Sequence, residues 1–537
     1  MARAFVRQLG SQPGIQLNPV IDRTGNGILG VFDRTAAIVG RFTRGRIDKP
    51  FRVNRSNFQD LLGKPASISL SALNEAYVHA YEALQRGAAE LVVYRLNVAA
   101  AANSWAVFTA GATSTFAVAS TLSGSYTLAV KHLGCHNDGI IVKVHAATKL
   151  VSGTPAANDV VTVKVCDADG KDMHIITGSL TAGSVDEFGQ SNYLPDVSAL
   201  VAGDILEWTI PVSQTIATTA DCYGKDSAGA DKWAASSALA TFSEGGTGYV
   251  STDYDRAVTA LTNGSEDFGY IMGGGTRAVS LITKLADLAY DTNRQFLFDV
   301  PGDLTVSGAI AFVQSLGFGT AGKDHYPQAY WAPLKSLDPV NGNVVIWGTS
   351  GAQVGKRCAR NSVTNAYGLA KKNQPVAGIA GQLERARVTQ VLQLSEQDLS
   401  DLADAKINPV IFRTFSTGTF PCFSDSLTCA MTKLSYRKLI TVAEMSAHVD
   451  ETVARYARDQ LQLPMAEAIQ NVKDFLEKFF GWCYASSWLV DSDDGETDPF
   501  VYEVARDSMS PADRMNIQYW LHYDGVARQI HVQQYIV

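Results

Sequence analysis

The sequence predicts a multidomain α+β protein. It should have a mixed α/β core built from its N-terminal and C-terminal parts, an inserted β-rich domain and extended terminal arms. The 537 residues exceed the roughly 250–300 that one hydrophobic core can serve. Helical and strand-like runs alternate over 251–415, which is typical of a mixed α/β domain. Residues 98–250 are instead rich in Ala, Ser, Thr and Gly, with short β-like runs between turn formers, which favours an all-β insertion.

The part before the insertion combines an arm with strands and a helix. Residues 1–20 have no helical period and contain Pro13-Gly14, so we expect an extended arm. The run AAIVGRF (36–42) is strand-like, LNEAYVHAYEALQRG (73–87) predicts a helix that ends at Gly87, and ELVVYRL (90–96) predicts a buried strand. Inside the insertion, the β-like runs include GIIVKVHA (139–146) and DVVTVKVCDA (159–168).

In the part after the insertion, segments with the helical period alternate with segments with the strand period. We expect helices over 277–291 and 307–317, with a buried strand over 294–301 between them. Ser395 is placed to cap a further helix that returns to a strand by residue 412. Two more helices are expected over 430–463 and 464–484. The last ten residues, RQIHVQQYIV, alternate and predict a strand that runs to residue 537.

One of these helices carries a clear apolar stripe. Its apolar residues recur at steps of four and three, which places them on one helical face. Such a stripe usually packs on the core of its own domain. Its members are Met465, Ile469, Val472, Leu476 and Phe479.

These patterns divide the chain into six segments. We expect the inserted domain to face outward, although composition alone does not require it. The segments are an arm over 1–20, a first core part over 21–97, the β-rich insertion over 98–250, an α/β core domain over 251–415, a C-terminal domain over 416–527 and an arm strand over 528–537.

Charge differs between the two ends of the chain. Residues 1–64 carry a net charge of +7, and residues 485–537 carry −6, within a total of −8. Two interpretations remain open: chance variation in solvated surfaces, or basic and acidic ends that meet within one chain or between chains. The overall negative charge argues against a general nucleic-acid binder.

Composition also limits the compartment and the chemistry. Seven cysteines without a C-x-x-C pair favour reduced, buried thiols in a protein made in a reducing cytoplasm. The first 19 residues lack the apolar stretch of a signal peptide, and no run approaches the roughly 18 apolar residues of a membrane span. We therefore expect a soluble protein without membrane insertion.

Three motifs suggest ligand sites and fail on context. Gly25, Gly27 and Gly30 match a dinucleotide fingerprint, but a strand-like run follows where a helix is needed. The segment Gly317–Lys323 is close to a P-loop, yet Asp324 stands where Ser or Thr should hold Mg²⁺. The acidic residues between Asp491 and Asp498 do not fit the frame of an EF-hand loop. We therefore predict no catalytic, cofactor-binding or metal-binding residues and no enzymatic activity.

Several segments resemble, in order, the motifs of contractile bacteriophage tail sheath proteins. The similarity covers about 1–97 and 251–537, and the insertion matches poorly. Two departures are Gly348 and Thr349, which replace a pair of prolines, and 417–431, where a Gly-x-Arg-Thr motif is not recognisable. The resembling segments are Pro13-Gly14-Ile15, AAIVGRFTRG (36–45), Lys49-Pro50, FQDLLGKP (58–65), FLFDVP (296–301), YPQAYWAPLKSLDPVNGN (326–343), GTSGAQVGKRCARN (348–361), NPVIFRTF (408–415) and LSYRKLITV (434–442).

The resemblance implies a structural subunit of a virion that assembles in the bacterial cytoplasm. Such subunits form stacked six-fold rings around an inner tail tube and contract to drive it through the envelope for genome ejection. The partners would be further copies of the chain, the tube protein, and the baseplate and tail terminator proteins. Neighbours would exchange arms, with Phe5, Val6 and Leu9 at one end and Ile530, Val532 and Ile536 at the other. The C-terminal domain would lie near the tube, with Glu467, Lys473, Asp474 and Lys478 as candidate tube contacts.

Two alternatives remain. The chain could serve a tailocin or a type VI-like injection machine, although a single chain with both arms favours phage or tailocin. A nucleotide-binding enzyme that uses Gly25–Gly30 or Gly317–Lys323 is a distant alternative.

Overall fold

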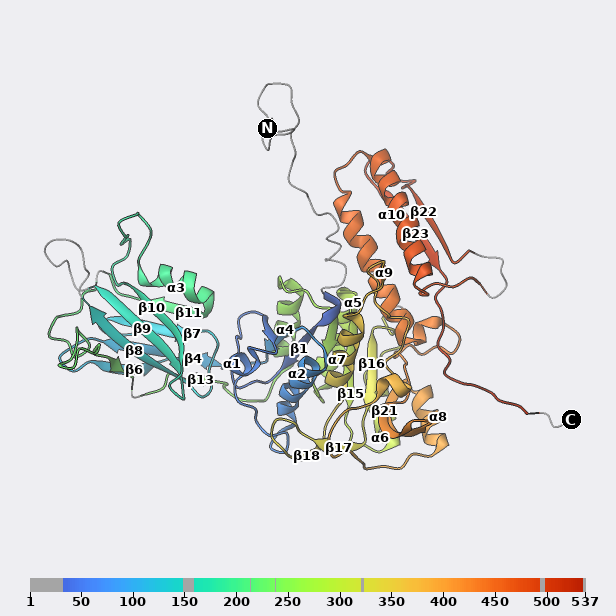
Figure 1. Ribbon diagram of the computed structural model, residues 1–537, viewed down its shortest axis with the longest axis horizontal. Coiled ribbons are helices and arrows are strands. Elements are labelled where there is room, and N and C mark those ends of the chain that lie inside the picture. The colour runs from blue at the N-terminus through green and yellow to red at the C-terminus, as the bar shows by residue number, and fades with distance from the viewer. Residues whose placement is uncertain are drawn as a thin grey trace, which may run out of the picture.

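The computed structural model describes residues 32–147, 159–212, 214–236, 238–319, 323–492 and 498–534. The predicted arm contacts Phe5, Val6 and Leu9 and the Gly25–Gly30 motif lie outside these ranges. Figure 1 shows a central α/β body, a β-rich domain beside it and a narrow C-terminal lobe that projects from the body. The predicted mixed α/β class is therefore confirmed, while the six segment boundaries stay predictions.

An eight-stranded sheet forms the central body. Its six inner strands run parallel in the order β3-β1-β14-β15-β16-β20, and the two edge strands β2 and β21 are antiparallel. Strands from both sides of the insertion thus share one sheet, and they meet where β1 pairs with β14. The bounds are β1 Thr35–Gly40, β2 Phe51–Asn54, β3 Glu90–Arg95, β14 Tyr270–Met272, β15 Gln295–Val300, β16 Pro327–Trp331, β20 Ile407–Phe415 and β21 Gly418–Phe423.

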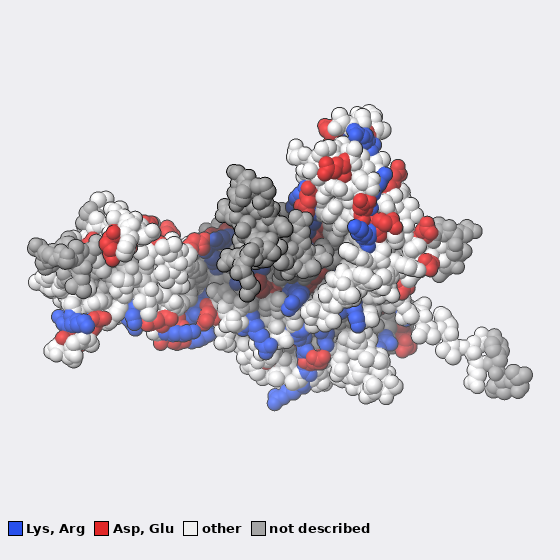
Figure 2. All heavy atoms as spheres, turned by 45° about the horizontal axis from the view of Figure 1, so that its top comes forward, with Lys and Arg blue, Asp and Glu red and all other residues white. Residues whose placement is uncertain are grey.

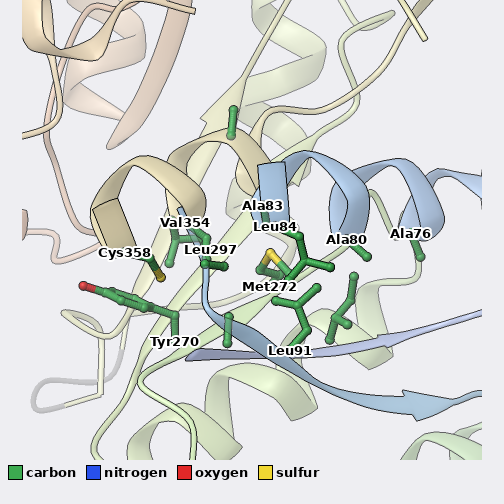
Figure 3. Close-up of a cluster of buried hydrophobic side chains, with 14 of the residues drawn as sticks. Ala76, Ala80, Ala83, Leu84, Leu91, Tyr270, Met272, Leu297, Val354 and Cys358 are labelled. Carbon is green, nitrogen blue, oxygen red and sulfur yellow. The ribbon is translucent and has the colours of Figure 1, made fainter. Parts of the chain in front are cut away.

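Helices cover both faces of this sheet, because alternate side chains of its buried strands point to opposite sides. Leu91 and Met272 face α2 (Glu75–Arg86) and α7 (Ser350–Asn361), as Figure 3 shows. The other face packs against α4 (Ser251–Asn263), α5 (Val279–Asp291), α6 (Val306–Ser315) and α8 (Glu396–Asp404). The predicted cap of α8 is confirmed, since the Ser395 side chain accepts a hydrogen bond from the Asp398 amide.

Two glycines let α2 and α7 approach closely. A Cβ on Gly351 would lie 2.5 Å from the His79 carbonyl oxygen, and one on Gly355 would lie 2.8 Å from that of Ala83. Both distances are too short for a real contact, so any larger residue would push the helices apart. Packing of α7 against α2 therefore explains two of the three glycines of the GTSGAQVG segment, Gly351 and Gly355.

The insertion is a β-sandwich. One sheet has the order β10-β9-β8-β12 and the other β11-β7-β5-β6, and a single apolar cluster fills the space between them. Helix α3 (Leu194–Ala202) covers one side, and a short pair, β4 with β13, closes the base. The bounds are β4 Ala102–Asn103, β5 Trp105–Thr109, β6 Thr115–Ala119, β7 Leu128–His132, β8 Ile140–Ala147, β9 Val160–Asp167, β10 Asp172–Ser179, β11 Leu206–Thr209, β12 Ala234–Ala235 and β13 Phe242–Ser243.

Ion pairs join the sandwich to the core. Arg44 pairs with Asp138, and the Arg46 guanidinium lies 2.7 Å from Asp204. Lys64 lies 2.9 Å from Asp169. The basic segment of the sequence thus meets the insertion, and within the described ranges none of its ion pairs reaches a residue beyond 484.

The C-terminal lobe consists of two helices and a hairpin. Helix α9 (Ile440–Asp459) leaves the core, α10 (Met465–Ala485) returns beside it, and β22 (Phe500–Arg506) pairs with β23 (Met515–Leu521). The α10 stripe predicted from the sequence is confirmed, because Val472, Leu476 and Phe479 are buried in the cluster that joins these elements. A small sheet of β17 (Leu334–Leu337), β18 (Val344–Ile346) and β19 (Thr389–Gln390) completes the core.

Buried charges fix the root of α9 in the core. The Glu444 carboxylate lies 2.8 Å from Arg360 and 3.6 Å from Arg357, and it accepts a hydrogen bond of 2.8 Å from the Tyr270 hydroxyl. Burial alone would raise the pKa of Glu444, but the two guanidinium groups outweigh it and hold that pKa below its usual value. Since both arginines belong to α7, the cluster ties α9 to the helical layer of the core.

Replacing Glu444 with glutamine should destabilise the protein strongly. The variant would leave two buried guanidinium groups without a carboxylate, which costs about 3–5 kcal/mol in such sites. The midpoint of urea unfolding should fall accordingly. Glu503→Gln, at an exposed position of β22, is the matched control and should change stability by less than about 0.5 kcal/mol. Equal midpoints for the two variants would contradict the structural role of Glu444.

Candidate interaction surface at the C-terminal end

The hairpin presents one face to the lobe and the other to solvent. Phe500 and Tyr519 point inward and contact the Phe480 ring, with centroid distances of 5.7 and 5.4 Å. On the outer face Val501 pairs with Trp520, and their exposed fractions are 47% and 55%. The hairpin is thus held by its inner face, while its outer face displays an apolar pair.

Both edges of this sheet are open. Within the described residues the sheet has only the strands β22 and β23, so one side of each strand lacks a ladder partner. Unpaired strand edges are templates for pairing with a further strand. Since α10 supports the inner face, the hairpin is a ready acceptor for added strands.

The C-terminal tail leaves the body in extended form. Residues 524–534 contain neither helix nor strand and run away from the lobe, as Figure 1 shows. Arg528 anchors this tail on the core through two hydrogen bonds to Asp425, of 2.8 and 2.5 Å. Beyond the anchor, Ile530 and Val532 are 79% and 89% exposed.

The segment predicted as a strand over 528–537 forms no strand within the single chain as far as residue 534, and its pairing with a neighbouring copy stays a prediction. A strand needs a ladder partner, and the tail lies against none in the part of the chain that the structure describes. The alternation of its apolar residues is retained without a surface to bury them. Ile536 lies outside the described residues.

The candidate tube contacts lie on the outer side of α10. Glu467, Asp474 and Lys478 are exposed and Lys473 is half-buried. Asp474 accepts a hydrogen bond of 2.7 Å from Gln470 on the next turn. A contact of these residues with another protein stays a prediction.

A buried Ser-His-Asp group was missed in the sequence. Ser350 lies 3.3 Å from the His79 Nδ1 atom and donates a hydrogen bond to Asp299. Asp299 also accepts hydrogen bonds from the backbone amides of Thr349 and Ser350, at 2.6 and 2.9 Å, where α7 begins. The three side chains are buried and line none of the main cavities. Asp299 therefore acts as a helix cap, and the acidic residue at the carboxyl end of its strand was the available signal.

The glycine-rich segment that starts at Gly317 begins with a turn, and the elements around it are not in the order of a phosphate loop. Helix α6 precedes it and β16 follows it, which reverses the order that a P-loop needs. Lys323 lies 3.2 Å from Asp287. Residues 320–322 and 493–497 lie outside the described ranges, so the EF-hand-like acidic loop is described only at its ends.

Three further features of the described ranges concern the cysteines, possible metal ligands and the helices. All seven cysteines are buried and free of disulfides there. No group of three or more His, Cys, Asp or Glu side chains in those ranges is arranged to hold a metal ion. None of the described helices has both the length and the apolar character to cross a bilayer.

A cavity of about 480 Å³ lies where the sandwich meets the core. Three histidines line it, of which His132 and His136 are buried. Burial, followed by the nearby Arg44, lowers the pKa of His136 to about 3. Burial also lowers the pKa values of His132 and His174. The junction therefore holds three neutral imidazole rings at neutral pH.

These rings should make stability depend on pH. The unfolded chain protonates histidine near pH 6.5, while the folded protein keeps the rings neutral. Their contribution is thus complete above pH 6.5 and is lost as the pH falls through their lowered pKa values, by up to about 1.4 kcal/mol per pH unit for each ring. For His136 this range extends down to a pH of about 3. Urea unfolding of His136→Gln between pH 6 and pH 5 should show a shallower slope than wild type. Identical slopes would contradict the assigned direction of the His136 shift.

The fold is similar to solved structures of contractile sheath proteins. A sheath tail protein from Desulfitobacterium hafniense matches 95% of this chain and 95% of its own, at 14% identity and a TM-score of 0.49. A chain of the anti-feeding prophage baseplate matches 56% of this chain and 76% of its own, at 12% identity and a TM-score of 0.40. A chain of an extracellular contractile injection system, the PVC sheath complex in its contracted state, matches 52% and 74%, at 15% identity and a TM-score of 0.41.

No family model matches the chain, and no curated protein matches it.

Proposed function

We propose that this chain is the structural subunit of a contractile tail sheath. Copies of it polymerise as stacked hexameric rings around an inner tube and contract to drive that tube through a bacterial envelope. The observation that carries the proposal is that one chain has both an acceptor and a donor for an added strand. The lobe offers a hairpin with two open edges, and the tail offers an extended segment with exposed, alternating apolar residues.

The tail and the hairpin supply a link between copies by β-augmentation. Residues 529–537 can span at most about 30 Å beyond the Arg528 anchor when fully extended. Added to the open edge of a neighbouring hairpin, they form a further strand whose backbone hydrogen bonds give the affinity. Because donor and acceptor are different surfaces, the contact is heterologous, and repeating it builds an open helical array.

Helix α9 allows this link to transmit movement from one subunit to the next. Its 20 residues span about 30 Å and connect the buried charges around Glu444 to the lobe that holds the hairpin. A helix fixed in the core at one end moves as a lever with that core. A shift of one subunit is thus passed to the neighbour whose tail is paired with its hairpin.

The remaining assignments follow from the same proposal. The exposed charges of α10, Glu467, Asp474 and Lys478, with the half-buried Lys473, would contact the tube protein, and the ends of the array would meet baseplate and tail terminator proteins. Contraction releases energy stored in the array and consumes no nucleotide, so the chain acts without catalysis. The same subunit design would serve a phage, a tailocin or a type VI-like machine.

Deleting residues 528–537 should abolish assembly and leave the subunit folded. The tail forms no ladder with its own chain as far as it is described, so its loss removes the donor strand and, from the subunit itself, the contact of Arg528 with Asp425. The fraction of protein that sediments as polymer should fall at least about tenfold, with an unchanged circular dichroism spectrum. Deleting residues 1–18 should have the same effect. Normal tubes from either truncation in electron micrographs would refute arm exchange.

Charged substitutions on the two faces of the tail should affect assembly differently. Ile530→Lys combined with Val532→Lys places charges where the tail would bury apolar side chains, each worth about 1.5–3 kcal/mol. We expect this variant to stay monomeric in sedimentation experiments. The matched control, His531→Lys with Gln533→Lys, alters the opposite face of the same segment and should assemble. Equal behaviour of the two variants would exclude a face-specific strand.

A further inference from the structure

The carboxylates of α10 and the hairpin differ from most charged groups of the molecule because they lack ion-pair partners in the described ranges. Residues 465–492 and 498–524 hold nine Asp and Glu against four Lys and Arg, a net charge of −5. Ion pairs elsewhere join the core to the sandwich and α9 to α7. Within the described ranges, none of these nine carboxylates lies within 4.0 Å of a lysine or arginine nitrogen; the ion pairs recorded there all involve other residues. Figure 2 shows acidic side chains spread over the projecting lobe.

A surface of the opposite kind lies where the tail leaves the core. We call it the tail-root surface, and it consists of Met431, Lys433, Leu434, Tyr436 and Lys438. Its two lysines form no ion pair within the described ranges. Leu434 is 94% exposed, and Gly525 of the tail lies against the Tyr436 ring.

The two surfaces match in chemistry. The outer face of the hairpin combines the apolar pair Val501 and Trp520 with the exposed Glu503, and Asp513 is exposed in the turn between the strands. The tail-root surface likewise combines large apolar side chains with unpaired lysines. Opposite potentials and apolar patches of this kind are what complementary protein surfaces show.

The acidic turn of the hairpin and the tail-root surface are apart in one chain. The tail-root surface directly precedes α9, whose 20 residues span about 30 Å before α10 returns beside it. The turn that holds Asp513 joins the two hairpin strands on this projecting lobe, whereas Trp520 is only five residues before Gly525, which lies against Tyr436. Two copies arranged head to tail can bring the acidic turn of one onto the tail-root surface of the other.

We propose that the tail-root surface of one copy binds the outer, acidic face of the hairpin lobe of the next copy. This inference rests on the proposed sheath function, because the donated tail places the two surfaces near each other. The tail starts at the tail-root surface, and its reach of about 30 Å limits how far the accepting hairpin can lie. The contact would set the direction in which the tail leaves, and the added strand would supply the affinity.

Charge reversal and charge exchange test this contact in the full-length chain. One variant carries Lys433→Glu and Lys438→Glu, a second carries Glu503→Lys and Asp513→Lys, and a third carries all four changes. None of the four side chains forms an ion pair in the described ranges. The matched control is Lys232→Glu with Lys335→Glu, two exposed lysines away from both surfaces. The readout is the protein concentration at which polymer first sediments, in 0.1 M and 0.5 M NaCl.

Each double reversal should raise that concentration on the order of tenfold in 0.1 M NaCl, and the four-site exchange should return it to within about threefold of wild type. The control should match wild type, and 0.5 M NaCl should weaken the wild type, because salt screens such contacts. The proposal is overturned if the exchange does not restore assembly, or if the reversals affect only binding to a separate tube protein. If the reversals assemble normally while the tail deletion fails, the sheath proposal stands and this contact falls. A wild-type chain that never polymerises overturns both.

Discussion

The buried carboxylate of Glu444 is the interaction on which the arrangement of this molecule depends. It joins α9 to two arginines of α7 and to Tyr270 of the central sheet. Those groups come from two elements of the core, α7 and β14, so one side chain fixes the direction of the helix that carries the C-terminal lobe. Breaking a buried pair of this kind costs far more than losing a surface contact. The lobe can therefore project from the body and still move with it.

The core and the C-terminal end differ in how far their backbone hydrogen-bonding groups and charges are paired and their apolar side chains are buried. In the core, the inner parallel strands have ladder partners on both sides, and helices cover both faces. The sandwich is tied to that core by ion pairs of Arg44, Arg46 and Lys64. At the C-terminal end the reverse holds, with open hairpin edges, an exposed tail and carboxylates without cationic partners in the described ranges. The core thus has its groups paired and buried, whereas the C-terminal end leaves strand edges, apolar side chains and charges open to a partner. This difference agrees with the proposed assembly.

Local periodicity was enough to predict the regular elements. The run over 73–87 became α2, the run over 294–301 became β15, and the apolar stripe of Val472, Leu476 and Phe479 is the buried side of α10. Local periodicity could not predict contacts between residues that are distant in the sequence. The Asp299 cap on α7 and its neighbour His79 lie 51 and 271 residues from Ser350, and no pattern in one sequence joins them. The strand expected over 528–537 is not formed within the single chain as far as residue 534, because alternation reports a preference for pairing and does not name the partner. Alternation in Met515–Leu521 held the same signal for β23 and was overlooked.

The central claim is that the tail of one copy completes the hairpin sheet of another, and an electron-microscopy reconstruction of the purified protein's polymer tests it most directly. The account predicts hollow tubes of six-fold symmetry, in which density for residues 529–537 forms a strand beside β22 or β23 of a neighbouring subunit. A polymer in which that tail folds back onto its own subunit, with the hairpin still two-stranded, would contradict the account.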